Sequence, residues 1–232
     1  MNYDCRAISL LYHKYGEGSV IAKIFTEEHG LQAFNIKKVR GGKFKSKISL
    51  LEKLSLVNIS AKKQPKKTIQ YLNEISLAYP LNNTELNKKL IRVFMAEILS
   101  KVLAENNKNS TLFKFIWNLT IELDHSKEID NNFCLKYLIA LTKFLGFFPS
   151  TENFEYPIFN LSTLNFTKKD GPSEIVIKGS NLKYFKALIT KKNLEIPYLN
   201  RQELLKKIFF YYKSNHYNLD NVKSHIVIEA LR

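Results

Sequence analysis

Apolar and polar side chains alternate along the first eighty residues of the chain. A period of two places successive side chains on opposite faces of a β-strand, so the pattern predicts strands. Two glycine-containing turns, YGEGS and EEHG, interrupt it. The predicted strands cover residues 6–13, 19–27, 31–39, 49–61 and 68–78. Five short strands predict a small β-barrel, for which the five-stranded OB-fold is our first choice and an SH3-like barrel is the alternative.

The period changes to that of a helix after Pro80. Apolar residues then recur at helical spacing in three stretches, which occupy residues 82–107, 110–125 and 130–150. The expected N-caps are Thr84 or Asn83, Ser110 and Asp130, and the expected stop of the third helix is Gly146. Three successive helices with short connections predict a small bundle.

The remaining sequence is less regular. FNLSTLNF and SEIVIKG each predict a short strand, a helix is predicted over 180–193, and the tail predicts one long and one final shorter helix. We therefore expect an α+β protein with two domains. The first is an OB-fold of residues 1–80, and the second is a helical domain of residues 81–232 with an irregular, short-strand segment at about 150–197.

Positive charge is concentrated in the N-terminal third of the chain. The whole sequence has 36 Lys and Arg against 21 Asp and Glu, for a formal net charge of +15. Residues 36–67 alone hold eleven cations and one acid, a net charge of +10. Such a distribution favours a polyanionic partner, nucleic acid first and an anionic membrane surface second.

The densest cationic stretch is IKKVRGGKFKSK, residues 36–47, with six cations, two glycines and no acid. Predicted strands flank it, which argues against a disordered tail. It also lacks the Gly-Lys-Ser/Thr spacing before a helix that a phosphate-cradling loop needs. We interpret it as a barrel loop that binds nucleic-acid phosphates, with a merely solvated loop as the alternative. Its candidate DNA-binding residues are Lys37, Lys38, Arg40, Lys43, Phe44, Lys45 and Lys47.

Two further groups of cations extend this hypothesis. One group flanks Pro65 in a connection that OB-folds often use for ligands, and the other lies within about one turn on the first helix. Their members are Lys62, Lys63, Lys66 and Lys67, and then Lys88, Lys89 and Arg92. For both groups a solvated surface is the alternative.

Three aromatic residues accompany the cations. Phe34 and Tyr71 alternate with polar residues inside predicted strands, so we expect both in the core. Phe44 has no apolar neighbours in the loop and is the candidate for stacking on a base, an interaction worth ~1–3 kcal/mol where it forms.

No motif predicts catalysis, a metal site or a cofactor. The five histidines are scattered, and Cys5 and Cys134 are too few and too far apart for a disulfide framework or a zinc cage. No stretch approaches the ~18 apolar residues of a membrane span, and the N-terminal residues do not match a signal peptide. We expect a non-enzymatic protein of the cytoplasm, associated with the nucleoid and not with a membrane.

An ordered set of motifs runs through most of the chain. It comprises YGEGSVIAKIFTEEHGL, KKVRGGKFKSK, LLEKLSLVNI, MAEILSKVL, LFKFIWNLTIEL, LKYLIALTKFLGFFPS and the pair Lys223-Ser224. Each motif alone is weakly specific, but together and in this order they resemble the RecO family of bacterial recombination mediators.

The resemblance implies an OB-fold joined to a helical domain. It also implies a DNA repair and recombination mediator that binds single- and double-stranded DNA and anneals complementary strands. The implied partners are RecR and the C-terminal tail of single-stranded DNA-binding protein, so that the RecA recombinase is loaded onto DNA coated by that protein.

The chain departs from the family pattern at one point. Many members carry a four-cysteine zinc cluster after the Gly-Phe-x-Pro helix end, whereas residues 150–197 contain no cysteine or histidine. No metal is therefore expected there. The alternative function that the residues leave open is a non-enzymatic RNA-associated, ribosome-associated or scaffolding protein.

Overall fold

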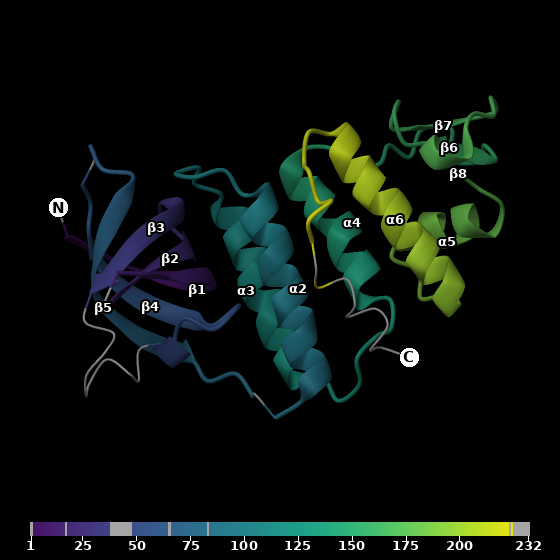
Figure 1. Cartoon of the computed structure of the whole chain (residues 1–232). Helices are drawn as coiled ribbons and strands as arrows, with labels where there is room; N and C mark the ends of the chain where they lie inside the picture. Colours follow the sequence, from purple (N-terminus) through teal and green to yellow (C-terminus); the bar gives the residue numbers. More distant parts are fainter. Residues whose placement is uncertain are drawn as a thin grey trace. The chain divides into compact units, whose positions relative to one another are not determined.

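The computed structural model describes residues 2–16, 18–37, 48–64, 66–82, 84–222 and 224. These residues form two compact units, Met1–Lys127 and Glu128–Arg232 (Figure 1). The predicted domain boundary at residue 80 marks the change from strands to helices, but the first compact unit continues through the next two helices. No helix in the described part of the chain is long and apolar enough to cross a bilayer.

The first unit begins with a closed five-stranded barrel (Figure 1). Its strands are β1 (Asn2–Tyr15), β2 (Ser19–Thr26), β3 (Gly30–Lys37), β4 (Leu56–Lys62) and β5 (Ile69–Tyr79). They pair in the order β1-β2-β3-β5-β4, and an antiparallel β1–β4 pair and a parallel β3–β5 pair complete the ring. This is the topology of an OB-fold, which confirms the first choice over the SH3-like alternative.

The barrel core is made by the alternating apolar positions that predicted the strands. Val20, Ala22 and Ile24 of β2 point inward together with Phe34 and Ile36 of β3, and all five are buried. Inward and outward side chains alternate along a strand, so the pairing register keeps the apolar set on one face. The expectation that Phe34 belongs to the core is confirmed.

One strand prediction was partly wrong. The fourth strand was expected from residue 49, but residues 48 and 49 are helical and turns follow over 50–54 before β4 begins at Leu56. The N–H of Leu51 donates to the carbonyl of Ile48 (2.9 Å), and the buried Leu54 adopts a positive φ of 61°. Leucines three residues apart fit a helical turn as well as they fit an uneven strand, and the pattern alone does not separate the two.

Helices α2 (Leu86–Val102) and α3 (Ser110–His125) complete the first unit. Packing between α3 and the barrel is aromatic: the ring centroids of Phe25 and Phe113 lie 5.5 Å apart. The guanidinium of Arg6 on β1 lies 4.9 Å from the ring centroid of Trp117. Large apolar side chains therefore join α3 to the barrel within one unit.

The helix caps differ from the predicted ones by a residue or two. Asn109 caps α3, and its side chain accepts a hydrogen bond from the N–H of Leu112 (2.9 Å), whereas Ser110 is the first helical residue. Glu85 precedes α2 without a side-chain cap bond, and the hydroxyl of the predicted cap Thr84 donates to the Asn82 side chain (2.8 Å). The other candidate for that cap, Asn83, lies outside the described residues.

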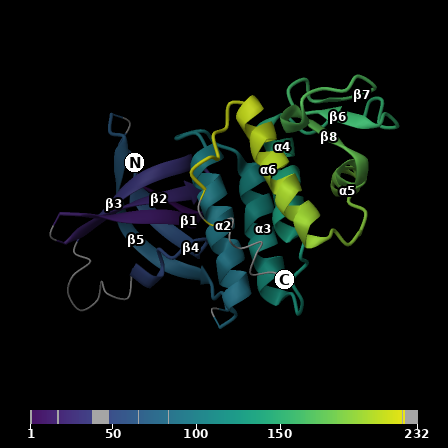
Figure 2. The same ribbon diagram turned by 45° about the vertical axis from the view of Figure 1, so that its right-hand side comes forward.

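The described part of the second unit contains three α-helices and a small sheet (Figure 2). Its elements are α4 (Phe133–Leu145), β6 (Ile158–Asn160), β7 (Asn165–Thr167), η2 (Ser173–Ile175), β8 (Val176–Lys178), α5 (Gly179–Ile189) and α6 (Tyr198–Ser214). The cap of α4 is Asn132 and not Asp130, and the predicted stop at Gly146 is confirmed by its left-handed φ of 85°.

The segment predicted as two short strands forms three, in the order β7-β6-β8. FNLSTLNF holds a hairpin of β6 and β7, so the single strand predicted there was wrong. Aromatic side chains pack this sheet: the Phe159 ring lies 4.9 Å from Phe166, 4.8 Å from Phe185 and 5.9 Å from Tyr211. The final short helix predicted in the tail falls outside the described residues.

Candidate nucleic-acid interface

Five lysines gather at one end of the barrel and are called here the lysine cluster. They are Lys37 at the end of β3, Lys62 at the end of β4, and Lys63, Lys66 and Lys67 in the connection to β5. All five side chains are exposed. Strand register explains the convergence, since β5 pairs with both β3 and β4 and its residue Tyr71 lies opposite Asn35 on one side and Lys62 on the other.

Tyr71 lies at the centre of the lysine cluster. The Nζ atoms of Lys37 and Lys67 are each 5.2 Å from the centroid of its ring. These distances are typical of cation–π contacts, which draw a lysine to the face of an aromatic ring. The expectation that Tyr71 is a core residue was wrong, because the side chain is only half-buried.

Gln70 holds the connection between β4 and β5 in shape. The side-chain oxygen of Gln70 accepts a hydrogen bond from the N–H of Gln64 (2.7 Å), and its amide nitrogen donates to the carbonyls of Gln64 (3.2 Å) and Lys67 (2.5 Å). A buried side chain thus pairs with the backbone polar groups of the loop, as buried amides require. The lysines of this connection are exposed.

No carboxylate in the described part of the chain makes an ion pair with a member of the lysine cluster. Uncompensated cations on a barrel end give a positive potential that attracts phosphates and falls with added salt. The arrangement therefore suits a polyanion and not a small neutral ligand.

The rest of the predicted basic loop begins directly after Lys37. The candidates Lys38, Arg40, Lys43, Phe44, Lys45 and Lys47 lie outside the described residues. Their role stays a prediction that rests on the sequence. Lys37 ties that prediction to the structure, since it closes β3 beside Tyr71 within the lysine cluster.

The predicted continuation of the cationic surface along α2 needs correction. Lys88 and Arg92 are buried, with exposed fractions of 2% and 3%, whereas Lys89 is exposed. The Nζ of Lys88 donates to the Glu85 side chain (2.8 Å) and to the carbonyl of Asp124 (2.9 Å). A side chain held in this way does not face a DNA backbone.

Arg92 joins the same internal network. Its guanidinium donates to the carbonyl of Asn82 (3.3 Å) and lies 3.6 Å from the Asp124 carboxylate. Burial lowers the pKa of Arg92, and the nearby Asp124 opposes that shift. The burial of Lys88 and Arg92 was not predicted from the sequence. The two residues are four positions apart and lie on the inner face of α2, and the spacing of charged residues alone does not show which face is buried.

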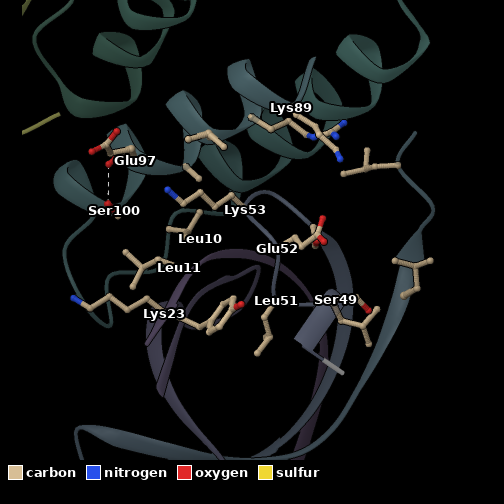
Figure 3. Close-up of a pocket in the computed structure, with 18 of the residues that line it drawn as sticks. Leu10, Leu11, Lys23, Ser49, Leu51, Glu52, Lys53, Lys89, Glu97 and Ser100 are labelled. Atoms are coloured by element: carbon tan, nitrogen blue, oxygen red, sulfur yellow. Dashed lines mark hydrogen bonds between the residues drawn. The ribbon is translucent and has the colours of Figure 1, made fainter. Parts of the chain in front are cut away.

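A large pocket lies between the barrel and α2 within the first unit (Figure 3), with a volume of about 1000 Å³. Leu10, Leu11 and Leu51 lie on its barrel side, and Lys53 and Lys89 are two of its cations (Figure 3). Two carboxylates, those of Glu52 and Glu97, also line it. An apolar surface with cations around it is the kind of surface that an amphipathic, acidic segment fits.

Known proteins are similar to this chain along its full length. Residues 1–81 match the family model described as "Recombination protein O N terminal". The "DNA repair protein RecO" of Flavobacterium psychrophilum is 30% identical over 239 residues, which cover 100% of this chain and 98% of that protein. The protein of that name from Flavobacterium johnsoniae is 30% identical over 88% of the chain and 84% of its own length, and that of Azobacteroides pseudotrichonymphae is 25% identical over 100% and 99%. With an OB-fold barrel and a full-length relative at this identity, the chain belongs to the RecO family of DNA repair proteins.

Proposed function

We propose that this protein binds single- and double-stranded DNA through its barrel and anneals complementary strands. The observation that carries the proposal is the lysine cluster at one end of an OB-fold barrel, next to a connection that is rich in further cations and holds Phe44. OB-folds bind single strands with positively charged surfaces and stacking aromatics. Contacts with phosphates carry no sequence information, so binding is tolerant of sequence.

Annealing follows from charge neutralisation. Two DNA strands repel each other through their phosphates, and lysines that neutralise phosphates on both strands lower this repulsion while the bases pair. Tyr71, half-buried between Lys37 and Lys67, offers an aromatic surface beside the phosphate-binding lysines. A base that stacks there is held next to the cations that neutralise its backbone.

The proposed activity needs no covalent chemistry. Burial raises the pKa of the Cys5 thiol to about 11 and that of Cys134 to about 12, so both thiols are protonated at neutral pH and are poor nucleophiles. Among the described residues, no three His, Cys, Asp or Glu side chains are grouped as metal ligands. We therefore propose a non-enzymatic mediator.

The proposed partners are RecR and the C-terminal tail of single-stranded DNA-binding protein, so that RecA is loaded onto DNA in the cytoplasm, at the nucleoid. The large pocket beside α2 supports a peptide partner, since an acidic tail with apolar residues matches its leucines and its Lys53 and Lys89. A fluorescent tail peptide should bind the full chain, and Lys53→Gln with Lys89→Gln should weaken that binding. An unchanged affinity in this double variant would place the tail elsewhere.

The proposed DNA-binding lysines are tested by salt dependence. Each lysine that neutralises a phosphate of a single strand contributes about 0.7 to the slope of log K against log salt, so Lys62→Gln with Lys66→Gln should lower the slope by about 1.4. Lys101→Gln with Lys114→Gln removes two exposed lysines from α2 and α3 and serves as the control. Equal slopes for the wild type and the Lys62 and Lys66 variant would refute phosphate binding by these two lysines.

Annealing is measured with complementary oligonucleotides at low salt. The wild type should accelerate pairing and the Lys62 and Lys66 variant should accelerate it less. A protein that does not bind single-stranded DNA would refute the proposed function, and one that binds structured RNA in preference to single-stranded DNA would support the RNA-associated alternative.

A further inference from the structure

A second pocket in the first unit, called here the loop pocket, lies where three connections meet. They are the turn between β2 and β3, the connection between β4 and β5, and the connection between α2 and α3. Its volume is about 410 Å³. It is lined by Glu28, His29, Gln32, Lys63, Gln64, Lys67, Gln70, Asn106 and Lys108.

The loop pocket collects positive charge from separate parts of the chain. Lys63 and Lys67 come from the lysine cluster, and Lys108 reaches the pocket from the connection between the helices. His29 faces the same space, and Glu28 is the one carboxylate among the residues that line it. Three ammonium groups and an imidazole against one carboxylate leave the pocket with an excess of cations.

The charges around the loop pocket affect the pKa of His29. Burial lowers the pKa of His29 first, Lys63 and Lys108 lower it further, and Glu28 opposes them. The edge of the ring also packs against Tyr3, with ring centroids 4.3 Å apart. An anion bound among these groups would favour the protonated form of the His29 imidazole, which would then be a fourth cation beside the three lysines.

The walls of the loop pocket are braced before any ligand arrives. The Tyr3 hydroxyl donates to Gln32 Oε1 (2.7 Å), and Gln32 Nε2 donates to Asn106 Oδ1 (3.4 Å). The N–H of Asn106 donates to the carbonyl of Leu31 (2.9 Å), which fixes the helix connection against β3. A site that is already ordered loses little conformational entropy on binding.

The wall also contains a buried polar atom that lacks a hydrogen-bond partner among the described residues. The buried side-chain oxygen of Gln64 makes no hydrogen bond with the described residues. In this orientation the amide oxygen of Gln64 can accept a hydrogen bond from a ligand. If the amide turns by 180°, its NH2 group can donate to a ligand oxygen at the same place.

We propose that the loop pocket binds the phosphate monoester at the end of a nucleic-acid strand, an inference that rests on the proposed DNA-binding function. A terminal monoester carries a charge of about −1.5 to −2 at pH 7, whereas an internal phosphodiester carries one negative charge, so the excess of cations favours the monoester. The volume of about 410 Å³ suits one nucleotide. Residues of three connections line the pocket, which suits a strand that ends there.

The test compares three short oligonucleotides of one sequence, with a 5′-phosphate, with a 3′-phosphate, or with hydroxyl groups at both ends. Binding to the full chain is measured by fluorescence anisotropy at pH 7 and fixed ionic strength. At least one phosphorylated strand should bind the wild type roughly three- to tenfold more tightly than the hydroxyl strand, the gain expected for one or two charge-assisted hydrogen bonds in a partly exposed site.

Variants identify the residues that cause the preference for a phosphorylated strand. His29→Gln with Lys108→Gln should remove it while leaving the affinity for the hydroxyl strand almost unchanged, and Lys108→Gln alone should reduce it. Lys62→Gln with Lys66→Gln should weaken binding to all three strands by the same factor, and the control Lys101→Gln should change neither quantity. A preference that survives in the His29 and Lys108 variant would overturn the proposal.

Competition distinguishes the terminal phosphate of a strand from free inorganic phosphate. Deoxyadenosine monophosphate should remove the preference at a lower concentration than inorganic phosphate, with sulfate at equal ionic strength as the reference. If inorganic phosphate competes equally well, the pocket is a site for free phosphate and the strand-end proposal is wrong. If all strands bind but none is preferred, this inference fails alone; if none binds, the proposed function fails.

Discussion

Replacement of Gly30 by alanine should destabilise the first unit. Gly30 has a φ of +71°, and a Cβ built on it would lie 2.2 Å from the carbonyl oxygen of Asn107 and 2.5 Å from the carbonyl carbon. The left-handed conformation costs an L-residue about 1–2 kcal/mol. The clash is with backbone atoms held by the hydrogen bond from Asn106 to Leu31, so relief requires that loop to move.

Overpacking of this kind typically costs about 1–3 kcal/mol. Together with the backbone term, the expected loss for Gly30→Ala is about 3 kcal/mol, or a fall of about 6–12 °C in Tm for a chain of this size. The matched control is Gly16→Ala, because Gly16 has a φ of +63° and nothing within 4 Å of its added Cβ. The control should lose only about 1 kcal/mol.

Unfolding of the first unit can be followed directly. Trp117 on α3 is the single tryptophan of the chain and is buried within this unit, with an exposed fraction of 7%. Its fluorescence in a denaturant titration therefore reports the unit that contains Gly30. Equal losses for Gly30→Ala and Gly16→Ala would refute the close approach of Asn107 and would weaken the case for a braced loop pocket.

Three further predictions concern other side chains. Asp124→Asn should cost about 2–4 kcal/mol in a denaturant titration, because it leaves the buried Arg92 without its carboxylate. The hydrogen bond from Arg6 lowers the pKa of Glu27. The stabilisation from this ion pair is therefore present above the unfolded pKa of about 4.5 and is lost as the pH falls through the folded pKa. Glu27→Gln should make Tm depend less on pH in that acidic range. Tyr71→Ala should weaken single-strand binding by about 1 kcal/mol, roughly fivefold in anisotropy, if a base stacks on the ring.

Each of these predictions has a result that contradicts it. Asp170→Asn removes an exposed partner of Lys178, and a loss of stability there as large as that for Asp124→Asn would show that burial is not the cause. A Tm profile of Glu27→Gln that keeps the wild-type slope at acidic pH would assign the slope to other carboxylates. Tyr198→Ala controls for the removal of a tyrosine, and equal DNA affinity in the two tyrosine variants would exclude stacking at Tyr71.

The sequence was informative wherever one face of an element is buried. Strands β2 and β3 were predicted within two residues of their observed ends because Val20 and Ile24 of β2 and Phe34 and Ile36 of β3 occupy alternate positions that belong to the barrel core. Gly146 was also informative, because it correctly predicted the end of α4 and adopts a left-handed φ there. Both signals are local, so the neighbouring residues suffice to interpret them.

Prediction failed where a side chain interacts with a distant segment. Lys88 was expected on the surface, and only the fold brings it to the end of α3, 36 residues further on. Tyr71 was assigned to the core because the alternation does not show that β3 and β5 bring two lysines to its ring. The loop pocket was missed for the same reason, since nothing in the neighbourhood of His29 or Lys108 in sequence relates them to each other.

The order of strands in the barrel bears on how sequence changes between β3 and β4 affect the fold. β3 pairs with β2 and β5, and β4 pairs with β1 and β5, so the ring closes without any pairing between β3 and β4. The codons between Lys37 and Ile48 can therefore gain or lose lysines, or whole residues, with no change in strand register. Under the proposed function, natural variants that differ in that interval should differ in DNA affinity and share the same thermal stability. Exchange of the interval between relatives, followed by measurement of both properties, tests this expectation.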